Sequence, residues 1–304
     1  MLEHRHQCLD RLTKIAIFLI ALMHGLGSHA ALRVQDDRGI AHEWAAPPTR
    51  IVTLLPSLSE AVCALGACQR LVGVDRYANH PESVLALPKL GGGLDPNIEA
   101  LVALKPDVVL MSTAGKSASR LEALGLKVVA LNTEKHADVQ RMLAVVARLL
   151  GLESAGSEAR PSGPVSQKLW QDMQTAVQAT SRGLPQRAKV YIEVGGAPYA
   201  ASASSFIGET LTMLGAVNVV PGTLGPFPKI NPEMVVRADP DVIILSETRL
   251  EQLHQRPGWS QLRALRKGQV CALSAAQSDV MVRPGPRLAE AAQIMARCLR
   301  EVLP

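Results

Sequence analysis

The second half of the chain repeats the pattern of the first half. Residues 97–112 read NIEALVALKPDVVLMS, and residues 231–247 read NPEMVVRADPDVIILSE. Matching segments lie on both sides of each copy: 57–67 and 204–216 upstream, and 126–131 and 268–274 downstream. We interpret each set of three segments as one α/β lobe. The chain is therefore predicted to form two matched lobes, and a cleft between two lobes is a common place for a small-molecule site.

Apolar segments alternate with short helical patterns through the first half of the chain. This alternation predicts a parallel sheet that is covered by helices on both faces. Ser57 and Glu60 have the spacing of a capping box, so we expect them to cap the helix that follows the first strand. The expected strands of this lobe are 50–55, 71–74, 108–111 and 128–131.

Two longer helical patterns, 136–150 and 166–181, follow without a strand between them. A single helical connection between two lobes predicts a stiff joint that permits only a small rocking motion. The second lobe begins with the strand 189–194 and ends with the helix 287–302. The predicted fold is α/β, with two Rossmann-like lobes, each a parallel-sheet α/β sandwich, joined by a long backbone helix. The expected boundaries are a signal peptide at 1–31, an N-terminal lobe at 48–150, a linker helix at 151–187 and a C-terminal lobe at 188–304.

The N-terminus has the pattern of an export signal. Arg5, Arg11 and Lys14 precede the apolar segment 15–23, and small residues follow it up to Ala30. The apolar segment has nine residues, which is short of the roughly 20 that span a bilayer. We expect cleavage near Ala30 and export to the periplasm. An uncleaved membrane anchor is the alternative.

Composition and motifs argue against several classes of function. The net charge of +5 is spread along the chain, and no run of Lys and Arg interleaved with aromatic residues indicates nucleic-acid binding. The sequence contains no G-x-S-x-G, H-E-x-x-H or G-x-x-x-x-G-K-[ST] motif, and no G-x-G-x-x-G follows a strand. We therefore expect neither catalysis nor an intrinsic cofactor.

Four cysteines remain if the signal peptide, which contains Cys8, is removed. Cys63 and Cys68 lie on either side of a glycine, and their offset of five does not place them on one helix face. Cys271 and Cys298 both belong to the second lobe, where a disulfide or free buried thiols are both open. No cysteine or histidine spacing indicates a zinc site, so no metal is expected.

Three segments carry a resemblance to a known family. They are 50–81 (RIVTLLPSLSEAVCALGACQRLVGVDRYANHP), 96–110 (PNIEALVALKPDVVL) and 278–295 (SDVMVRPGPRLAEAAQIM). Together they resemble the periplasmic solute-binding proteins of ABC importers, in the branch with a helical backbone, and the likeness spans about residues 50–300. Members of this branch carry cobalamin, haem or iron-siderophores, and the cobalamin-binding members are the most similar.

The resemblance implies capture of a cobalamin-like corrinoid between the lobes and its delivery to an ABC permease dimer. Haem or an iron-siderophore is the alternative ligand within the same class. An alternative from another class is an exported enzyme that modifies a tetrapyrrole. That enzyme would need acid, base or metal-ligating groups that converge in the cleft, and the sequence indicates none.

The resemblance also assigns two glutamates to permease docking. Glu99 and Glu233 match the positions at which each lobe of these receptors contacts arginines of the permease. They occupy equivalent places in the repeat, and each falls in the first turn of a short helix. A carboxylate is favoured there by the helix dipole, so simple helix capping is the other interpretation.

Four residues match ligand-binding positions of the cobalamin-binding members: Tyr77, Phe227, Asp279 and Arg283. Aromatic rings suit the broad apolar face of a corrin, and polar groups suit its amide rim. Ordinary turn packing is the alternative for the two aromatic residues.

The sequence also departs from that pattern. Gly91–Gly93 stand where cobalamin receptors place a pocket tryptophan and haem receptors an iron-ligating tyrosine. Haem needs an axial ligand, which His80 or Tyr77 could supply.

Overall fold

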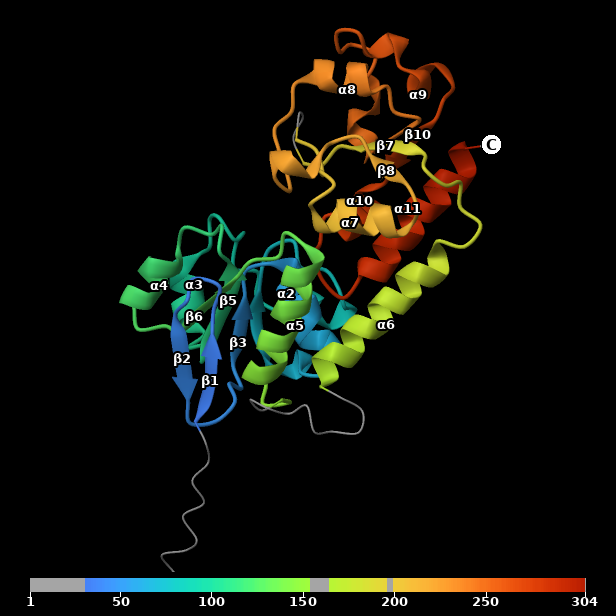
Figure 1. Ribbon diagram of the computed structural model, residues 1–304. Helices are drawn as coiled ribbons and strands as arrows, with labels where there is room; N and C mark the ends of the chain where they lie inside the picture. Colours follow the sequence, from blue (N-terminus) through green and yellow to red (C-terminus); the bar gives the residue numbers. More distant parts are fainter. Residues whose placement is uncertain (1–30, 154–163, 196–198, 304) are drawn as a thin grey trace, which may run out of the picture.

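The computed structural model describes residues 31–153, 164–195 and 199–303. The predicted signal peptide and its cleavage site near Ala30 lie outside this part of the chain. Two α/β lobes are arranged along one long helix, α6, which is Val165–Thr180 (Figure 1). The predicted fold class is confirmed, whereas the exact lobe boundaries remain a prediction.

The two sheets have the same topology, which explains the sequence repeat. Each has four strands, in the order β4-β3-β5-β6 in the first lobe and β10-β9-β7-β8 in the second. Counted within its own lobe, each sheet places its first strand between the second and the third, and all neighbours are parallel. The strands are β3 Ile51–Thr53, β4 Leu71–Val74, β5 Val108–Ser112, β6 Val128–Leu131, β7 Lys189–Ile192, β8 Val217–Asn218, β9 Val242–Ser246 and β10 Val270–Leu273.

The repeated Pro-Asp pair has a structural role at the start of these strands. Asp107 accepts hydrogen bonds from the backbone N–H groups of Thr49 and Arg50, each at 2.8 Å. Asp241 accepts one from the backbone N–H of Lys189 at 2.9 Å. Each aspartate thereby fixes the register between the first and third strands of its lobe, so this part of the repeat serves the fold.

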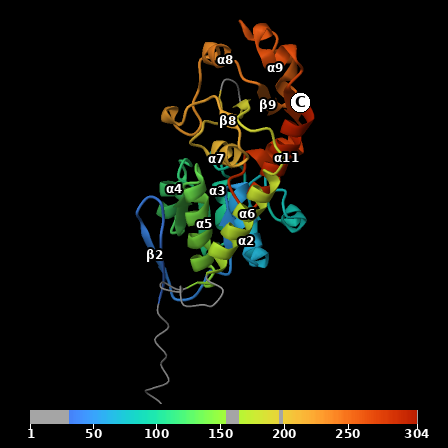
Figure 2. The same cartoon turned by 45° about the vertical axis from the view of Figure 1, so that its right-hand side comes forward.

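Helices cover the sheets and join the lobes. The first lobe contributes α2, α3, α4 and α5, and the second contributes α7 to α11. The helix α6 packs against α5 on one side and α11 on the other (Figures 1 and 2). The bounds are α2 Pro56–Ala64, α3 Ile98–Ala103, α4 Ala118–Ala123, α5 His136–Leu149, α7 Phe206–Met213, α8 Pro232–Ala238, α9 Arg263–Arg266, α10 Ala275–Met281 and α11 Leu288–Val302.

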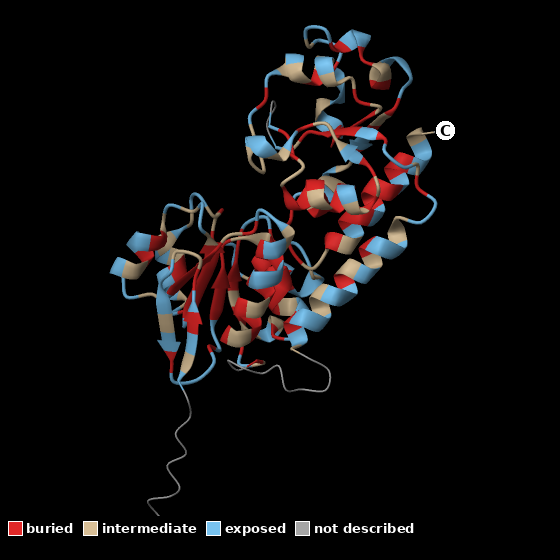
Figure 3. Ribbon diagram, in the orientation of Figure 1, coloured by how far each residue is buried: buried red, intermediate tan, exposed pale blue. Residues whose placement is uncertain are grey.

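One apolar cluster runs through both lobes. Met173 and Val177 of α6 belong to the same cluster as the inner faces of both sheets, and each sheet has a second cluster on its other face. The strands of the first sheet are buried, whereas much of the outer face of α6 is exposed (Figure 3). The continuous core makes the lobes and the connecting helix one packed unit.

A short hairpin precedes the first sheet and was not predicted. Its strands are β1 (Leu32–Gln35) and β2 (Ala41–Trp44). Asp36 closes the turn by accepting hydrogen bonds from the N–H groups of Arg38 and Ile40, and Gly39 takes a φ of +82°. The segment before the first sheet therefore begins as an antiparallel hairpin beside α5.

The cysteines form two disulfides. Cys271 and Cys298 join β10 to α11, which is one of the two states left open for them. Cys63 and Cys68 are also bonded. They do not share a helix face, because α2 ends before the turn at Gly66, and that turn returns Cys68 to the end of the helix.

Candidate ligand-binding site between the lobes

Arg283 connects the two lobes at the seam between them. It follows α10 of the second lobe, is 5 % exposed, and reaches into the first lobe. Its guanidinium donates to Glu60 at 3.0 Å, to the side chain of Asn79 at 2.7 Å and to the backbone carbonyl of Tyr77 at 2.9 Å. A fourth hydrogen bond, at 2.9 Å, goes to Asp279, one helical turn earlier on α10.

Glu60 is the buried partner of Arg283, and its predicted role in capping is wrong. The helix α2 begins at Pro56, its N-cap residue Leu55 has no side-chain hydrogen bond, and Glu60 lies further along the helix. Burial raises the pKa of Glu60, against the opposing hydrogen bond and charge of Arg283. Arg287 lies 3.9 Å from the same carboxylate oxygen, so two arginines face one buried acid.

Tyr77 and Asp279 come from different lobes and lie beside the same guanidinium. Tyr77 is 64 % exposed, and the side chain of Asp279 is 45 % exposed. Asn79 donates to Asp279 at 3.0 Å, which adds a second polar contact across the seam. An exposed tyrosine of one lobe, through its backbone carbonyl, and a partly exposed carboxylate of the other therefore meet at Arg283.

Gly91–Gly93 form a tight turn next to Tyr77. Gly91 has a φ of +87°, and a Cβ there would lie 2.6 Å from the backbone oxygen of Asp95. A Cβ on Gly92 would lie 3.9 Å from the tyrosine ring. The glycines satisfy the turn, and the space beside Gly92 is bordered by the side chains of Asp95, Arg76 and Tyr77.

Phe227 lies in the second lobe, beside a different contact between the lobes. Its ring packs edge-on against Phe206 at 5.8 Å between centroids. The backbone N–H of Phe206 donates to the carbonyl of Glu134 in the first lobe at 2.7 Å. Phe227 is partly buried, so the alternative of ordinary packing describes much of its environment.

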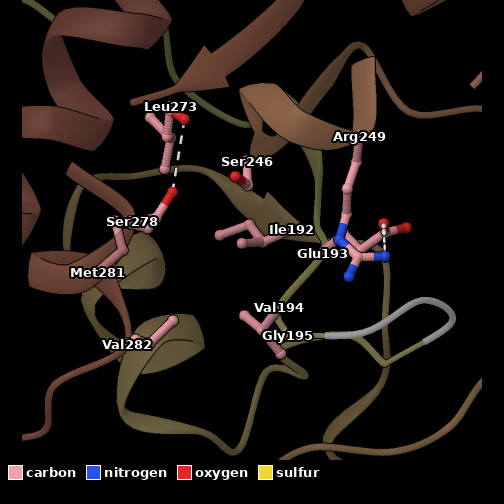
Figure 4. A pocket seen from close by; sticks show the side chains of 10 residues that line it. All are labelled: Ile192, Glu193, Val194, Gly195, Ser246, Arg249, Leu273, Ser278, Met281 and Val282. Atoms are coloured by element: carbon pink, nitrogen blue, oxygen red, sulfur yellow. Dashed lines mark hydrogen bonds and ion pairs between the residues drawn. The ribbon is translucent and has the colours of Figure 1, made fainter. Parts of the chain in front are cut away.

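A small pocket occupies the carboxyl edge of the second sheet. It lies between the ends of β7, β9 and β10 and one face of α10 (Figure 4), and its cavity volume is about 40 Å³. Arg249 lies at one end and Val282 at the other (Figure 4). The lining residues are Ile192, Glu193, Val194, Gly195, Ser246, Arg249, Leu273, Ser278, Met281 and Val282.

Glu99 and Glu233 are exposed in the first turns of α3 and α8, one helix in each lobe. Asn97 accepts from the N–H of Ala100, and Asn231 accepts from the N–H of Glu233, so the asparagines are the N-caps. Glu233 lies 3.9 Å from the guanidinium of Arg237. Helix capping therefore does not require either glutamate side chain.

Sequence reasoning missed three features of this region. Glu60 was assigned to a cap, Asn79 had no assigned role, and the arginine-lined pocket was not anticipated. Glu60 and Arg283 are 223 residues apart, so no local pattern joins them. The strongest available signal was the charged Glu193 at the end of an otherwise apolar strand segment, 189–194.

Residues 51–276 of this chain match the model of the periplasmic binding protein family. The chain belongs to that family. Among the described helices, none is long and apolar enough to cross a membrane. The predicted family resemblance is therefore confirmed, and the two-lobe fold agrees with it.

Two relatives show what the sequence of this chain is similar to. An ABC transporter substrate-binding lipoprotein of Bacillus subtilis (strain 168) is 27% identical over 261 residues, with 83% of this chain and 80% of the relative covered. The vitamin B12-binding protein of Vibrio cholerae serotype O1 is 26% identical over 259 residues and covers 84% of this chain and 90% of its own length.

Solved structures extend the comparison. The periplasmic vitamin B12 binding protein of Vibrio cholerae has a TM-score of 0.65 with 23% identity, and 84% of this chain and 98% of that one are covered. A periplasmic haem-binding protein in complex with two haems has a TM-score of 0.68 with 24% identity, covering 84% and 99%. The fold is thus shared by receptors of different tetrapyrroles.

Proposed function

We propose that this chain is a periplasmic receptor that captures a corrinoid between its lobes and delivers it to an ABC permease. The observation that carries the proposal is the seam at Arg283, where Tyr77 of one lobe and Asp279 of the other are held together and left exposed. An aromatic ring suits the apolar face of a corrin, and a carboxylate can accept hydrogen bonds from its rim amides.

Family membership supports the transport role. The named relatives are binding proteins, two of them for vitamin B12 and one for haem. A tetrapyrrole-modifying enzyme would need converging acid, base or ligating groups. Within the described residues, no three His, Cys, Asp or Glu side chains gather as they would to hold a metal ion. We propose binding without chemistry, in the periplasm after export.

Haem is the second candidate, and His80 is the reason. His80 is exposed and lies three residues from Tyr77. Partial burial and the charge of Arg287 lower its pKa, which favours the neutral imidazole. Neutral imidazole is the form that ligates iron. We propose His80 and Tyr77 as the candidate axial ligands if the ligand is haem.

Titration calorimetry of the mature protein with cyanocobalamin tests the main proposal. We expect saturable heat and a higher melting temperature, because ligand at 100 times its Kd adds about 2.7 kcal/mol of stability. No heat and no shift would reject the corrinoid. A sharp Soret band that survives desalting after incubation with haemin would assign the receptor to haem instead.

A pair of variants locates the site. Tyr77→Ala is expected to weaken binding about tenfold, as for the loss of a central aromatic contact. Leu124→Ala is the control, because Leu124 is also exposed but precedes β6 at the opposite edge of the first sheet. Equal affinities for the two variants would place the ligand away from Tyr77.

A further inference from the structure

The two lobes differ in charge at one equivalent position of the repeat. Leu54 and Glu193 both follow the first strand of their lobe, and their N–H groups donate to the equivalent carbonyls of Leu110 and Ile244, at 2.8 and 2.9 Å. Leu54 is buried and apolar, whereas the side chain of Glu193 is a carboxylate that is 1 % exposed. The fold therefore does not require an acid here, which suggests a local role for it.

Residues other than Arg249 supply the hydrogen bonds to the Glu193 carboxylate. Arg256 binds both carboxylate oxygens, at 2.5 and 2.9 Å, and Tyr191 donates to one of them at 3.3 Å. Arg256 also stacks over the ring of Trp259, with its Cζ 4.5 Å from the centroid. This bidentate pair satisfies the buried acid without any help from Arg249.

Arg249 gives the pocket a surplus positive charge. Its guanidinium is 4.0 Å from Glu193, beyond hydrogen-bond distance, and its side chain is 25 % exposed. Within the described parts of the chain its guanidinium makes no hydrogen bond to another residue. Two arginines thus face one carboxylate, and Figure 4 shows the guanidinium of Arg249, which lines the pocket, beside Glu193.

Apart from Arg249 and the buried Glu193, which also lines it, the pocket is apolar except for two hydroxyls. Its walls are mostly aliphatic, and Ser246 and Ser278 contribute the hydroxyl groups. A cavity of about 40 Å³ is far smaller than a tetrapyrrole, so it can take one substituent and no more. A ligand substituent with an aliphatic chain and a terminal anion has the polarity that this pocket can accommodate, because the walls are mostly aliphatic and Arg249 lies at one end.

The pocket lies beside the proposed ligand seam. Ser278 and Val282 of the α10 segment line it, while Asp279 and Arg283, one residue further along, face the first lobe. A ligand that contacts Tyr77 and Asp279 therefore lies on one side of the α10 segment, and the pocket with Arg249 lies on the adjacent side. A flexible substituent of a bulky ligand can span that separation.

We infer that this pocket, with Arg249 at its end, binds an anionic oxygen group on a side arm of the transported ligand. The group is either a carboxylate, as on the arms of haem, or a phosphodiester, as on the nucleotide arm of cobalamin. Arg249 is a ligand-binding residue that determines specificity for charged over neutral forms. The identity of the ligand in this inference rests on the proposed function. The existence of the anion site does not depend on it.

Matched ligand pairs test the inference in the full-length mature protein. Arg249→Gln is expected to weaken the binding of haemin or cyanocobalamin about tenfold. The same variant should change the affinity for haemin dimethyl ester or dicyanocobinamide, which lack the anion, less than twofold. Arg249→Lys should lose less, because it keeps the charge. Arg266→Gln on α9 removes one exposed charge of the same lobe and should leave all four affinities unchanged. Equal losses for charged and neutral members of a pair would overturn the inference, and so would no loss at all.

A ligand-independent measurement separates this inference from the proposed function. In NMR titrations, pentanoate should shift the Arg249 Nε–H signal and the methyl signals of Val194 and Met281, and pentan-1-ol should not shift the Arg249 signal. In Arg249→Gln the methyl shifts with pentanoate should disappear. If the wild type binds neither tetrapyrrole but responds to pentanoate, the ligand proposal fails and the anion site stands. Unmoved Val194 and Met281 signals in the wild type would reject the site.

Discussion

Arg283 is the single residue on which we expect the joint between the lobes to depend most. Its removal leaves Glu60, whose side chain is 1 % exposed, without its closest cation. Breaking a buried ion pair from one side costs about 3 kcal/mol or more. We therefore expect Arg283→Ala to lower the free energy of unfolding by about 3 kcal/mol in urea denaturation.

Two further variants separate this effect from a general loss of charge. Arg300→Ala removes an exposed arginine whose hydrogen bonds to other described residues go to backbone carbonyls, and it should cost well under half as much. Glu60→Gln combined with Arg283→Met removes both buried charges and should recover part of the loss. A loss below about 1 kcal/mol for Arg283→Ala would show that the pair is not the main joint.

Asp36 supplies a test by pH. Burial opposes its ionisation, but the N–H groups of Ile40 and Ala130 and the side chain of Arg38 outweigh burial and lower its pKa below the usual 3.8. The stability that it contributes is present above its ordinary pKa and is lost as the pH falls through the lower, folded pKa. Acid should therefore weaken the hairpin turn.

We expect Asp36→Asn to cost about 2 kcal/mol at neutral pH, the scale of a hydrogen bond to a charged group. The variant should also show a shallower fall in unfolding free energy from about pH 5 downward. Asp172→Asn on the exposed face of α6 is the control and should change neither quantity appreciably. Parallel pH curves for wild type and Asp36→Asn would contradict the assignment.

At the scale of elements, the two disulfides should differ in their effect on stability. Cys271–Cys298 closes a loop of 27 residues and joins β10 to α11, whereas Cys63–Cys68 closes a loop of five. The loop-entropy model gives roughly 3.5 and 2 kcal/mol for these lengths. Replacing Cys271 and Cys298 by alanine should therefore lower the free energy of unfolding by about 1.5 kcal/mol more than replacing the other pair. Chemical denaturation of the two double variants measures this, and an equal or reversed order would contradict it.

The sequence predicted elements well where a local pattern defines them. The strands Leu71–Val74 and Val128–Leu131 have the predicted bounds. The helix α5 differs from its predicted range by one residue at its end, and α6 differs by one residue at both ends. The hairpin at Leu32–Trp44 was missed although Asp36 and Gly39 are typical hairpin-turn residues, because its strands have only four residues each and half of those residues are polar. The periodicity of an apolar face is a strong signal, and a four-residue edge hairpin gives almost none.

The site was less predictable than the fold for a different reason. Glu60 was assigned to its own helix, since local spacing suggested a cap, whereas its partner Arg283 comes from the other lobe. Whether an arginine contacts a ligand or an acid 223 residues away depends on how the lobes pack. Only the three-dimensional arrangement contains that information.

At the scale of the whole molecule, the lobes are joined by more than the backbone helix. The N–H of His136 donates to Glu209 at 2.6 Å, and its ring contacts Thr210 at 2.9 Å, so α5 and α7 meet directly. The apolar core continues through α6. These contacts and Arg283 favour a receptor that changes shape little when it binds its ligand. A permease would then recognise surface positions whose separation is already set.

Glu99 and Glu233 are the candidates for such positions. Both are exposed, one in each lobe, and asparagine side chains already cap their helices. Exposed charges of this kind contribute within about 0.5 kcal/mol to folding. We therefore expect the double variant Glu99→Ala with Glu233→Ala to fold and to bind its ligand within twofold of the wild type.

Transport should respond differently, because loss of a charge that pairs with a fixed arginine across an interface costs about 2 kcal/mol or more. In vesicles that contain the cognate permease, the double variant should reduce ligand uptake by at least about tenfold, and each single variant should have an intermediate effect. Glu43→Ala with Glu301→Ala removes one exposed carboxylate from each half of the chain and should leave uptake unchanged. Full uptake by the Glu99 and Glu233 double variant would exclude docking, and a parallel loss of ligand affinity would place these residues in the binding site instead.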